Sequence, residues 1–392
     1  MSDDTRRTRR NVLRTGASLA LVGGLAGCSQ DESGDTPAAE SETDGAAGTD
    51  SGTPSETTTA TESSYSVSIE PMGEVTFDSV PETWVANNGS WADMGIALGQ
   101  EPPAGVWLPG RYHTRYYDEI PDVSVDVDGI QQLWGDSGVG KEQFYEIDAD
   151  VHVLDPNFLL NRGQWDQSDI DEIATQIGPF FGNSVFSRSY DWHADYRYYT
   201  LYEAFEKLAD VFQERERFEA MNEIHEEFQA DLAPVVPGQS ERPEAPVLWA
   251  GGTEPEEFFP YVQSEGTSFK HLRDLGVRDS LASSGVKDFH AERGAIDYEV
   301  LLDIDPELLL VRGQEPKSAA EFRDSVVSFM QDHAVASDLT AVENGDVYQA
   351  GPLYQGPITN LVVTERLARD LYGHEGELFD RQAVADVVTG DF

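Results

Sequence analysis

A short pattern occurs twice in the chain, as EQFYEIDADVHVL at residues 142–154 and as EVLLDIDPELLLV at residues 299–311. Each copy predicts a short helix, a tight acidic turn and a buried strand. Glu, Ile and Asp are identical between the copies at a fixed offset of 157 residues, the difference between 299 and 142. Two copies of one unit so far apart indicate two lobes of similar build. Coincidence is the alternative, because helix–turn–strand units recur in any α/β protein.

Apolar runs and amphipathic stretches alternate on both sides of these copies, which is typical of an α/β fold. The predicted strands are 83–86, 105–108, 151–154, 247–250, 308–311 and 347–349. The predicted helices are 91–98, 170–177, 268–275, 319–332 and 358–371. We therefore expect two similar Rossmann-like lobes, at residues 67–196 and 235–392, with a ligand cleft between them.

The longest helical pattern lies between the two copies, at residues 197–234. Its apolar residues repeat at helical spacing, pass a charged interval at 214–217, and then continue. One continuous helix here would be a stiff connector between the lobes. Two packed helices broken near Arg215 are the alternative.

The chain is strongly acidic, with 26 basic and 73 acidic residues among 392 and a formal net charge of -47. This charge excludes an ordinary nucleic-acid binder, which needs a surplus of Lys and Arg against phosphates. Only 5 of the basic residues are Lys. Together with the excess of carboxylates, this favours a halophilic protein, because high salt screens the repulsion between surface charges. A merely acidic protein is the alternative.

The first 28 residues resemble an export signal. TRRNVLR at residues 8–14 resembles a twin-arginine signal, and a mildly apolar run at 17–26 is too short to span a membrane. LAGC at 25–28 resembles a lipobox, in which Cys28, the single Cys of the chain, is lipidated. Residues 29–66 are rich in Ser, Thr, Gly and acidic residues, and we expect them to be a disordered tether. These features predict a lipid-anchored protein on the outer side of the cytoplasmic membrane.

Catalytic motifs do not fit the sequence. GDSGVGK at 135–141 matches most of a phosphate-binding loop, but Glu142 follows where Ser or Thr would hold magnesium. Zinc-hydrolase and Gly-x-Ser-x-Gly signatures are absent from the sequence. We therefore predict a binding protein with no catalytic residues, cofactor or metal ligands of its own. An exported hydrolase or redox enzyme on an α/β framework and a surface adhesin are the alternatives.

Cationic and aromatic residues gather in the loops after the predicted strands, where open α/β sheets bind ligands. RYHTRYY at 111–117 is the densest such segment. The candidate ligand-binding residues are Asn88, Trp91, Arg111, Tyr112, His113, Arg115, Arg162, Trp165, Arg188, Arg312, Tyr354 and Gln355. Arg forks bind carboxylates and aromatic rings supply flat walls, so this set suits a bulky anion such as a ferric chelate. The alternatives are core aromatics and surface ion pairs, and Asn88 also begins a glycosylation sequon.

These features together resemble the lipid-anchored substrate-binding proteins of ABC importers for ferric siderophores, haem and vitamin B12, in their haloarchaeal branch. The resemblance covers about residues 67–372. Besides the lipobox, the two copies and the middle helix, it rests on VPETWVA at 80–86 followed by MGIALG at 94–99.

The resemblance implies two αβ lobes joined by one rigid helix around a shallow cleft, and a ligand of the iron(III)-chelate type, with a corrinoid or haem as alternatives. Glu142 and Glu299 would dock onto Arg pockets of an ABC permease dimer that works with its ATPase. The alternative role for both is to stabilise a helix N-terminus. Residues 111–117 and the acidic stretch 118–128 depart from the family pattern.

Overall fold

A hairpin opens the part of the chain that the structure describes. The computed structural model describes residues 64–135, 138–188 and 190–392. The predicted export signal at 1–28, with Cys28, and the predicted tether up to residue 63 lie outside the described residues. The hairpin consists of β1 (Tyr65–Ile69) and β2 (Gly73–Phe77), which pair antiparallel. The first strand thus includes Tyr65 and Ser66, two residues that the sequence interpretation placed in the tether.

The N-terminal lobe, built from residues 64–200, holds a parallel four-stranded sheet in the order β5-β4-β3-β6. Its strands are β3 (Trp84–Ala86), β4 (Gly105–Val106), β5 (Gln131–Gln132) and β6 (Val151–Val153). Its helices are α1 (Gly89–Ala97), α2 (Lys141–Ile147), α3 (Pro156–Phe158) and α4 (Gln167–Gln176). β3 and β6 are buried at every position, as expected for strands covered on both faces of a sheet.

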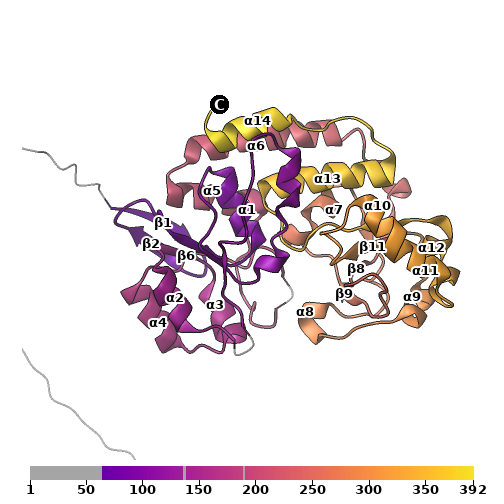
Figure 1. Ribbon diagram of the computed structural model, residues 1–392, viewed down its shortest axis with the longest axis horizontal. Helices are drawn as coiled ribbons and strands as arrows, with labels where there is room; N and C mark the ends of the chain where they lie inside the picture. Colours follow the sequence, from indigo (N-terminus) through magenta and orange to yellow (C-terminus); the bar gives the residue numbers. More distant parts are fainter. Residues whose placement is uncertain (1–63, 136–137, 189) are drawn as a thin grey trace, which may run out of the picture. The chain divides into compact units, whose positions relative to one another are not determined.

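The C-terminal lobe, built from residues 244–355, holds a second four-stranded sheet in the order β12-β11-β8-β9, in which only β9 is antiparallel (Figure 1). Its strands are β7 (Glu244–Ala245), β8 (Val247–Trp249), β9 (Phe259–Tyr261), β10 (Arg278–Asp279), β11 (Leu309–Arg312) and β12 (Val347–Gln349), of which β7 and β10 pair separately. Its helices are α7 (Lys270–Asp274), α8 (Phe289–Glu292), α9 (Tyr298–Ile304), α10 (Ala319–Phe322), α11 (Ser328–Asp332) and α12 (Thr340–Asn344).

Short helical turns complete both lobes. The 3-10 turns are η1 (Pro109–Arg111), η2 (Thr114–Glu119), η4 (Gln239–Glu241), η5 (Thr267–Phe269) and η7 (Ala336–Asp338), and the π-helical turns are η3 (Leu159–Gly163) and η6 (Arg323–Val327). Every strand and helix predicted within the two lobes is present, with ends that differ by up to three residues. The predicted helix at 319–332 consists of α10, η6 and α11 in succession. The predicted α/β fold with two lobes is confirmed.

The repeated pattern forms the same backbone in both lobes. In the first copy α2 ends at Asp148, whose φ of 52° is left-handed, and β6 follows. In the second copy α9 ends at Asp305, with a φ of 41°, and β11 follows. Asp tolerates this conformation better than most residues. The helix, the acidic turn and the buried strand of each copy are therefore confirmed.

The single long connecting helix is wrong, and the alternative of two helices is correct. α5 (Leu201–Phe212) ends at Gln213, which has a left-handed φ of 55°, and α6 (Arg215–Leu232) starts two residues later. Arg215 turns back to the end of α5, where it pairs with Glu206 at 2.6 Å and Asp210 at 3.0 Å. The apolar faces of the two helices pack together, with the Phe205 and Phe218 ring centroids 5.4 Å apart. The charged interval in the sequence marks this break.

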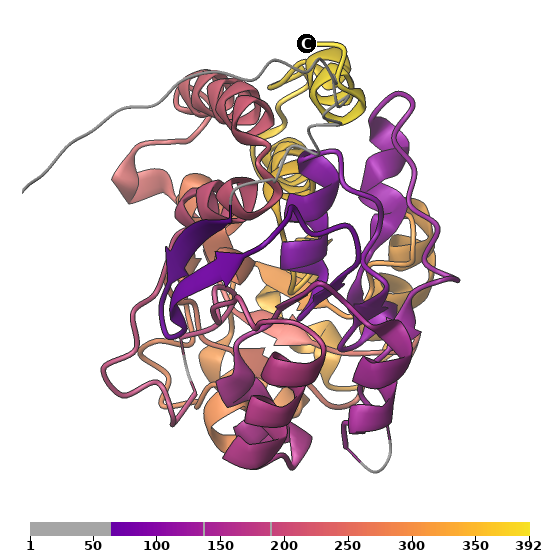
Figure 2. The ribbon, with the colours of Figure 1, turned by 90° about the vertical axis from the view of Figure 1, so that its left-hand side faces the viewer.

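Two C-terminal helices link the lobes. α13 (Pro357–Tyr372) contacts α1 and η2 of the N-terminal lobe and α7 of the C-terminal lobe, and α14 (Arg381–Thr389) packs on α6 (Figure 2). The backbone N–H of Thr359 donates to Asp93 on α1 at 3.0 Å, and that of Gln355 donates to Ser90 at 3.0 Å. The apolar core runs without interruption from the N-terminal lobe through α5, α6 and α13, and a second cluster lies beneath α9 to α12.

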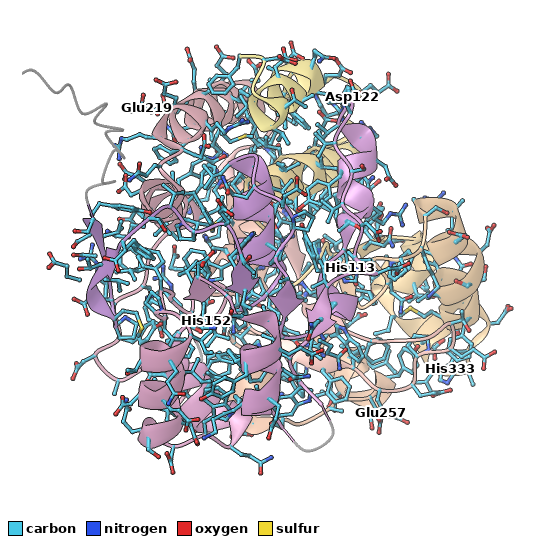
Figure 3. The ribbon with its side chains drawn as sticks, turned by 60° about the vertical axis from the view of Figure 1, so that its left-hand side comes forward. His113, Asp122, His152, Glu219, Glu257 and His333 are labelled. Carbon is cyan, nitrogen blue, oxygen red and sulfur yellow. The ribbon has the colours of Figure 1, made fainter. Side chains whose placement is uncertain are left out.

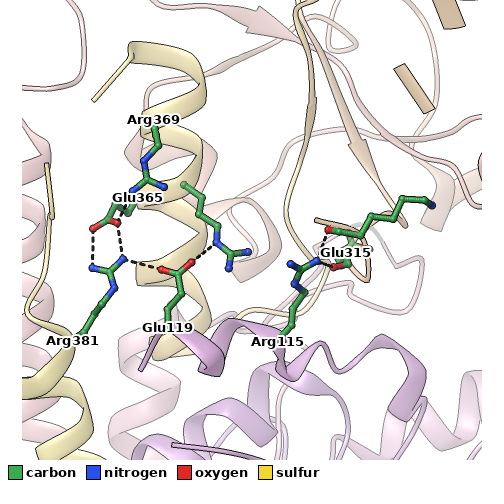
Figure 4. A network of polar contacts seen from close by, with 8 residues as sticks. Arg115, Glu119, Glu315, Glu365, Arg369 and Arg381 are labelled. Atoms are coloured by element: carbon green, nitrogen blue, oxygen red, sulfur yellow. Dashed lines mark hydrogen bonds and ion pairs between the residues drawn. The ribbon is translucent and has the colours of Figure 1, made fainter. Parts of the chain in front are cut away.

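Polar contacts from η2 add a further connection between the lobes (Figure 4). Glu119 accepts from Arg366 on α13 at 2.6 Å and from Arg381 at 2.8 Å. Arg115 donates to the backbone carbonyls of Glu315 and Lys317 in the C-terminal lobe. The segment that departs from the family pattern therefore fastens the N-terminal lobe to the rest of the molecule. None of the helices in the described ranges is both long and apolar enough to cross a membrane.

Candidate ligand-binding site

A cavity of about 210 Å³ lies between the lobes, and both lobes supply its walls. The N-terminal lobe contributes Trp107, Leu108, Arg111, Trp134, Phe158, Arg162 and Tyr190, and the C-terminal lobe with its following loop contributes Tyr261, Phe289, His290, Arg293 and Tyr354. We call this space the outer cavity. Almost all of its lining side chains are aromatic or cationic.

The aromatic wall of the N-terminal lobe follows from the strand order. Trp107, Trp134 and Phe158 come just after β4, β5 and β6, so the parallel strands deliver them to one edge of the sheet. The Trp107 and Trp134 rings stack with centroids 5.1 Å apart, and Phe158 meets Trp107 edge-on at 5.0 Å. This arrangement offers a broad apolar surface to a flat ligand.

Three guanidinium groups give the outer cavity its charge. Arg162 lies over the rings of Tyr190 at 5.4 Å and Trp192 at 5.6 Å, and Arg293 lies over Phe289 at 4.7 Å. Arg111 lines the cavity from η1. Among the described residues, none of these three cations forms an ion pair with a carboxylate. Cation–π contacts hold such a group in place while leaving its N–H donors available to an anion.

The electrostatic environment keeps these groups cationic and their histidine neighbour uncharged. Burial, and the nearby charge of Arg293, lower the pKa of Arg162, but an arginine still holds its proton at neutral pH. Burial also lowers the pKa of His290, against the opposing effect of Asp288, 3.3 Å away. The outer cavity therefore carries a surplus of positive charge at neutral pH.

The chain as a whole has the opposite sign, with 73 acidic and 26 basic residues. Figure 3 shows Asp122, Glu219 and Glu257 at the periphery, and all three are exposed. A cationic cavity in a chain with a net charge of -47 concentrates positive potential at one place. No three His, Cys, Asp or Glu side chains in the described ranges come together in the manner of a metal site.

The family follows from a comparison of sequences. The family model described as periplasmic binding protein matches residues 142–353, which is more than half of the chain. The chain belongs to this family. Periplasmic binding proteins of this type are solute-binding components of ABC importers, and they are binding proteins rather than enzymes. A search of curated proteins finds no match.

Solved structures of other periplasmic binding proteins share the fold. PiuA of Streptococcus pneumoniae, an iron uptake ABC transporter substrate-binding protein, is 16% identical over 78% of this chain and 98% of its own, with a TM-score of 0.53. A periplasmic binding protein of Veillonella parvula is 15% identical over 80% and 99%, with a TM-score of 0.54. The haem-binding protein HmuT is 16% identical over 79% and 90%, with a TM-score of 0.53. At these identities the likeness concerns the fold alone.

The structure brings together a minority of the residues that the sequence singled out. Arg111, Arg162 and Tyr354 line the outer cavity. Arg111 also lines a second space of about 20 Å³ together with His113 and Arg312, and we call this space the inner cavity. Figure 3 shows His113 at the border between the lobes, where its Nε2 lies 3.6 Å from a Glu315 carboxylate oxygen.

Other candidates of the N-terminal lobe have structural roles in this periplasmic binding protein. Asn88 is buried and caps α1 by accepting from the Ser90 N–H, which leaves no access for a glycan at its side chain in the folded chain. The Trp91 indole donates to the Asn183 carbonyl at 3.2 Å, and the Trp165 indole donates to the Val139 carbonyl at 2.7 Å.

The remaining candidates also lie away from the outer cavity. The hydroxyls of Tyr112 and Tyr117 are hydrogen-bonded at 2.8 Å inside the core. Gln355 is fully buried and donates to the Pro352 carbonyl at 2.9 Å. Arg188 lies over the Tyr198 ring at 4.7 Å, and Arg115 makes the contacts between lobes described above.

Several lining residues were not found from the sequence. These are Trp107, Leu108, Trp134, Phe158, Tyr190, Tyr261, Phe289, His290 and Arg293. Trp107 and Leu108 are the last two residues of the predicted strand 105–108, so a search that included the last two residues of each predicted strand, as well as the loop after it, would have found both. β5 has only two residues and α8 only four, so neither produces a periodic signal that would draw attention to Trp134 or Arg293.

The two glutamates assigned to docking occupy equivalent places. Glu142 lies in the first turn of α2 and Glu299 in the first turn of α9. Both are exposed, and neither makes an ion pair with another described residue. They are therefore accessible to a partner from solvent.

Proposed function

We propose that this periplasmic binding protein captures an iron(III) chelate of the siderophore type outside the cell and delivers it to an ABC permease. The observation that carries the proposal is the set of three guanidinium groups, of Arg111, Arg162 and Arg293, which line an aromatic cavity and form no ion pair with a carboxylate of the described residues. Ferric chelates built from carboxylate or catecholate groups are bulky and negatively charged, so both features complement them.

Haem is the second candidate for the ligand, and the aromatic wall supports it. Stacked Trp107 and Trp134 suit a flat macrocycle, and haem carries carboxylates that arginine binds. A corrinoid fits this set less well, because it offers fewer anionic groups to three cations. The proposed order of preference is therefore anionic ferric chelates, then haem, then corrinoids.

Quenching of tryptophan fluorescence tests the choice of ligand. The full chain at high salt is titrated with ferric citrate, a ferric tris-catecholate, a ferric hydroxamate, haem and cobalamin. We expect an anionic ferric chelate to quench the signal, because Trp107 and Trp134 line the outer cavity. If none of the five changed either the fluorescence or the melting temperature, the proposal would be wrong.

A matched pair of arginine variants tests the role of the cavity charge. Arg162→Gln removes one cation that faces the ligand, and a lost charge-assisted hydrogen bond should weaken binding by about tenfold to a hundredfold. Arg278→Gln is the control, because Arg278 is exposed on β10, where it pairs with Glu244 and donates to the Arg242 carbonyl, and it does not line the outer cavity. Equal affinities for the two variants would show that the ligand binds elsewhere.

Docking of the loaded protein involves Glu142 and Glu299 under this proposal. Exposed carboxylates on corresponding helices of the two lobes can meet two basic pockets of a permease dimer. The double variant Glu142→Gln/Glu299→Gln should bind ligand normally but lose stimulation of the permease ATPase in vesicles. Glu146→Gln, an exposed residue later on α2, is the control. Full stimulation by the double variant would exclude this docking mode.

Export by the twin-arginine route and anchoring through Cys28 also belong to the proposal. They rest on the sequence of residues 1–28. Cys28→Ala should release the protein from the membrane fraction into the medium, whereas Arg9→Lys/Arg10→Lys should retain it inside the cell. Unchanged membrane association of the Cys28 variant would contradict the lipid anchor.

A further inference from the structure

Arg312 is a cation buried without a matching anion. It lies at the end of β11 with no exposed surface, and its guanidinium sits between the rings of Phe269 at 4.8 Å and Tyr261 at 5.7 Å. Its Nη2 donates to the Ser268 carbonyl. Its Nε and Nη1 are buried and have no hydrogen-bond partner among the described residues. Buried polar groups, and above all buried charges, are normally paired.

The inner cavity lies against this guanidinium. It measures about 20 Å³ and is lined by Arg111, His113, Trp249, Arg312, Glu315 and Leu353. That is room for one water-sized particle, and too little for a carboxylate or a phosphate group. Arg111 lines both cavities, so the inner cavity is adjacent to the outer one.

The charges around the inner cavity do not balance. Arg111 and Arg312 carry two positive charges, and Glu315 can supply one negative charge. Burial and the two nearby arginines Arg111 and Arg115 lower the pKa of His113 to about 4, which leaves it neutral at neutral pH. Asp288 is the next acid in the field of Arg312, but it caps α8 by accepting from the His290 N–H and also accepts from the Val262 N–H.

Glu315 does not neutralise Arg312 by contact. One of its carboxylate oxygens accepts from the Gly313 N–H at 3.1 Å, and the other lies 3.6 Å from His113. No carboxylate oxygen of the described residues lies within 4.0 Å of the Arg312 guanidinium. Arg312 therefore lines the inner cavity while two of its donors have no hydrogen-bond partner among the described residues.

We propose that the inner cavity is a halide site, in which one chloride ion accepts N–H donors from Arg312 and Arg111. A monatomic anion matches the size of the cavity, and its charge offsets the excess cation. A water molecule would fit the space but would leave that charge uncompensated. The bound chloride holds Arg111 in place at the boundary of the outer cavity, and Arg111 is the one lining residue that the halide site shares with the site that takes the chelate.

Bromide diffraction tests the site directly. The full chain is crystallised with chloride replaced by bromide, and anomalous data are collected at the bromine edge. The expected result is an anomalous peak between the guanidinium groups of Arg111 and Arg312. A water molecule without anomalous signal at this place, or bromide found only beside Arg162 and Arg293, would overturn the proposal.

Thermal unfolding in different salts provides a test in solution. At constant ionic strength, replacing chloride by glutamate, which is too large for the inner cavity, should lower the melting temperature by a few degrees, and bromide should restore it. Arg312→Met should abolish this halide dependence, and Arg278→Gln should retain it. Glu315→Gln removes the competing negative charge, so it should tighten halide binding. The melting temperature of this variant should therefore rise at a lower halide concentration than that of the original chain. Identical melting temperatures in chloride and glutamate would refute the site even if Arg312→Met failed to fold.

Discussion

The two helix–turn–strand units, α2–β6 and α9–β11, share one backbone but are stabilised by different interactions. Both helices end at a left-handed Asp. At the first helical position the N-terminal unit has Lys141, which forms surface ion pairs with Asp169 at 2.7 Å and Glu172 at 2.8 Å. The C-terminal unit has Tyr298 there, which is buried and donates to the Pro255 carbonyl at 2.7 Å. The left-handed Asp at the turn is thus common to both units, whereas the contacts that fasten the unit to its lobe differ.

The buried strands differ in the same way. His152 of β6 corresponds to Leu309 of β11, and both side chains are fully buried. His152 Nδ1 lies 3.0 Å from the Gly178 carbonyl, and its Nε2 has no partner among the described residues. The N-terminal unit therefore contains a titratable group where the C-terminal unit has an aliphatic one.

Removing Tyr298 should have the largest effect. Its ring packs against Phe258 at 5.0 Å and His333 at 4.6 Å, so Tyr298→Ala leaves a cavity and should cost about 3–5 kcal/mol of unfolding free energy. Chemical denaturation measures this value. Tyr298→Phe is the control and should lose only about 1 kcal/mol, for its hydrogen bond. A cost of Tyr298→Ala no greater than that of Tyr298→Phe would contradict the packing role.

Exchanging the strand residues should change the dependence of stability on pH. Burial lowers the pKa of His152 to about 4, so the unfolded chain takes up a proton at higher pH than the folded chain. The stability from this group is complete above about pH 6.5 and is lost as the pH falls toward 4. In the His152→Leu variant, the unfolding free energy should therefore fall less between pH 6.5 and pH 4, by up to about 3 kcal/mol.

The reciprocal variant Leu309→His is the matched control for this exchange. It places an imidazole in the corresponding strand of the other lobe, so its destabilisation should grow as the pH falls. Unfolding free energies of all three proteins are measured between pH 7 and pH 4.5. Parallel pH profiles for the original chain and His152→Leu would show that His152 is not held neutral.

The sequence predicted the architecture well because the relevant signals are local. Buried apolar runs such as those of β8 and β11 can be recognised without knowledge of their neighbours. The break between α5 and α6 depends on the left-handed conformation of Gln213. Glutamine has no preference for this conformation, so the sequence does not predict it. The charged interval beside it was compatible with either alternative, and tertiary packing of the two helices decided between them.

The outer cavity was harder to predict, because its residues come together only in three dimensions. The strand-end rule found Arg111 and Arg162. Arg293 directly follows the four-residue helix α8, and Tyr190 lies in a loop that follows no strand, so neither carries a local signal. The aromatic residues of 111–117 were noticed in the sequence, but their role was ambiguous. The sequence around a Tyr in a loop does not distinguish a side chain that faces a ligand from one that, like Tyr112, is buried in the core.

Replacing the left-handed Asp residues by glycine should have effects of opposite sign in the two units. The Asp148 side chain has no hydrogen-bond partner among the described residues, so Asp148→Gly mainly relieves an unfavourable φ and should stabilise by a few tenths to about 1 kcal/mol. Asp305 accepts from both the N–H and the hydroxyl of Thr340, at 3.0 and 3.1 Å, so Asp305→Gly should destabilise by about 1 kcal/mol. The denaturant midpoints of unfolding measure the stability changes of both variants. A midpoint shift of the same sign in Asp148→Gly and Asp305→Gly would contradict the different roles of the two Asp side chains.

The smallest effect is expected at Lys141, and it should depend on salt. The ion pairs of Lys141 with Asp169 and Glu172 raise the pKa of the amine, but all three groups are partly exposed, and exposed pairs contribute little. Lys141→Gln should lower the melting temperature by at most about 2–4 °C in dilute buffer, and by nothing measurable at molar salt, where screening acts within about 3 Å. Tyr298→Phe serves as the comparison, because a buried hydrogen bond should be insensitive to salt. If the Lys141 effect persisted at molar salt, packing rather than ion pairing would hold the start of α2. The two units would then be stabilised in the same way, by packing, and would differ only in the size of the side chain at the first helical position.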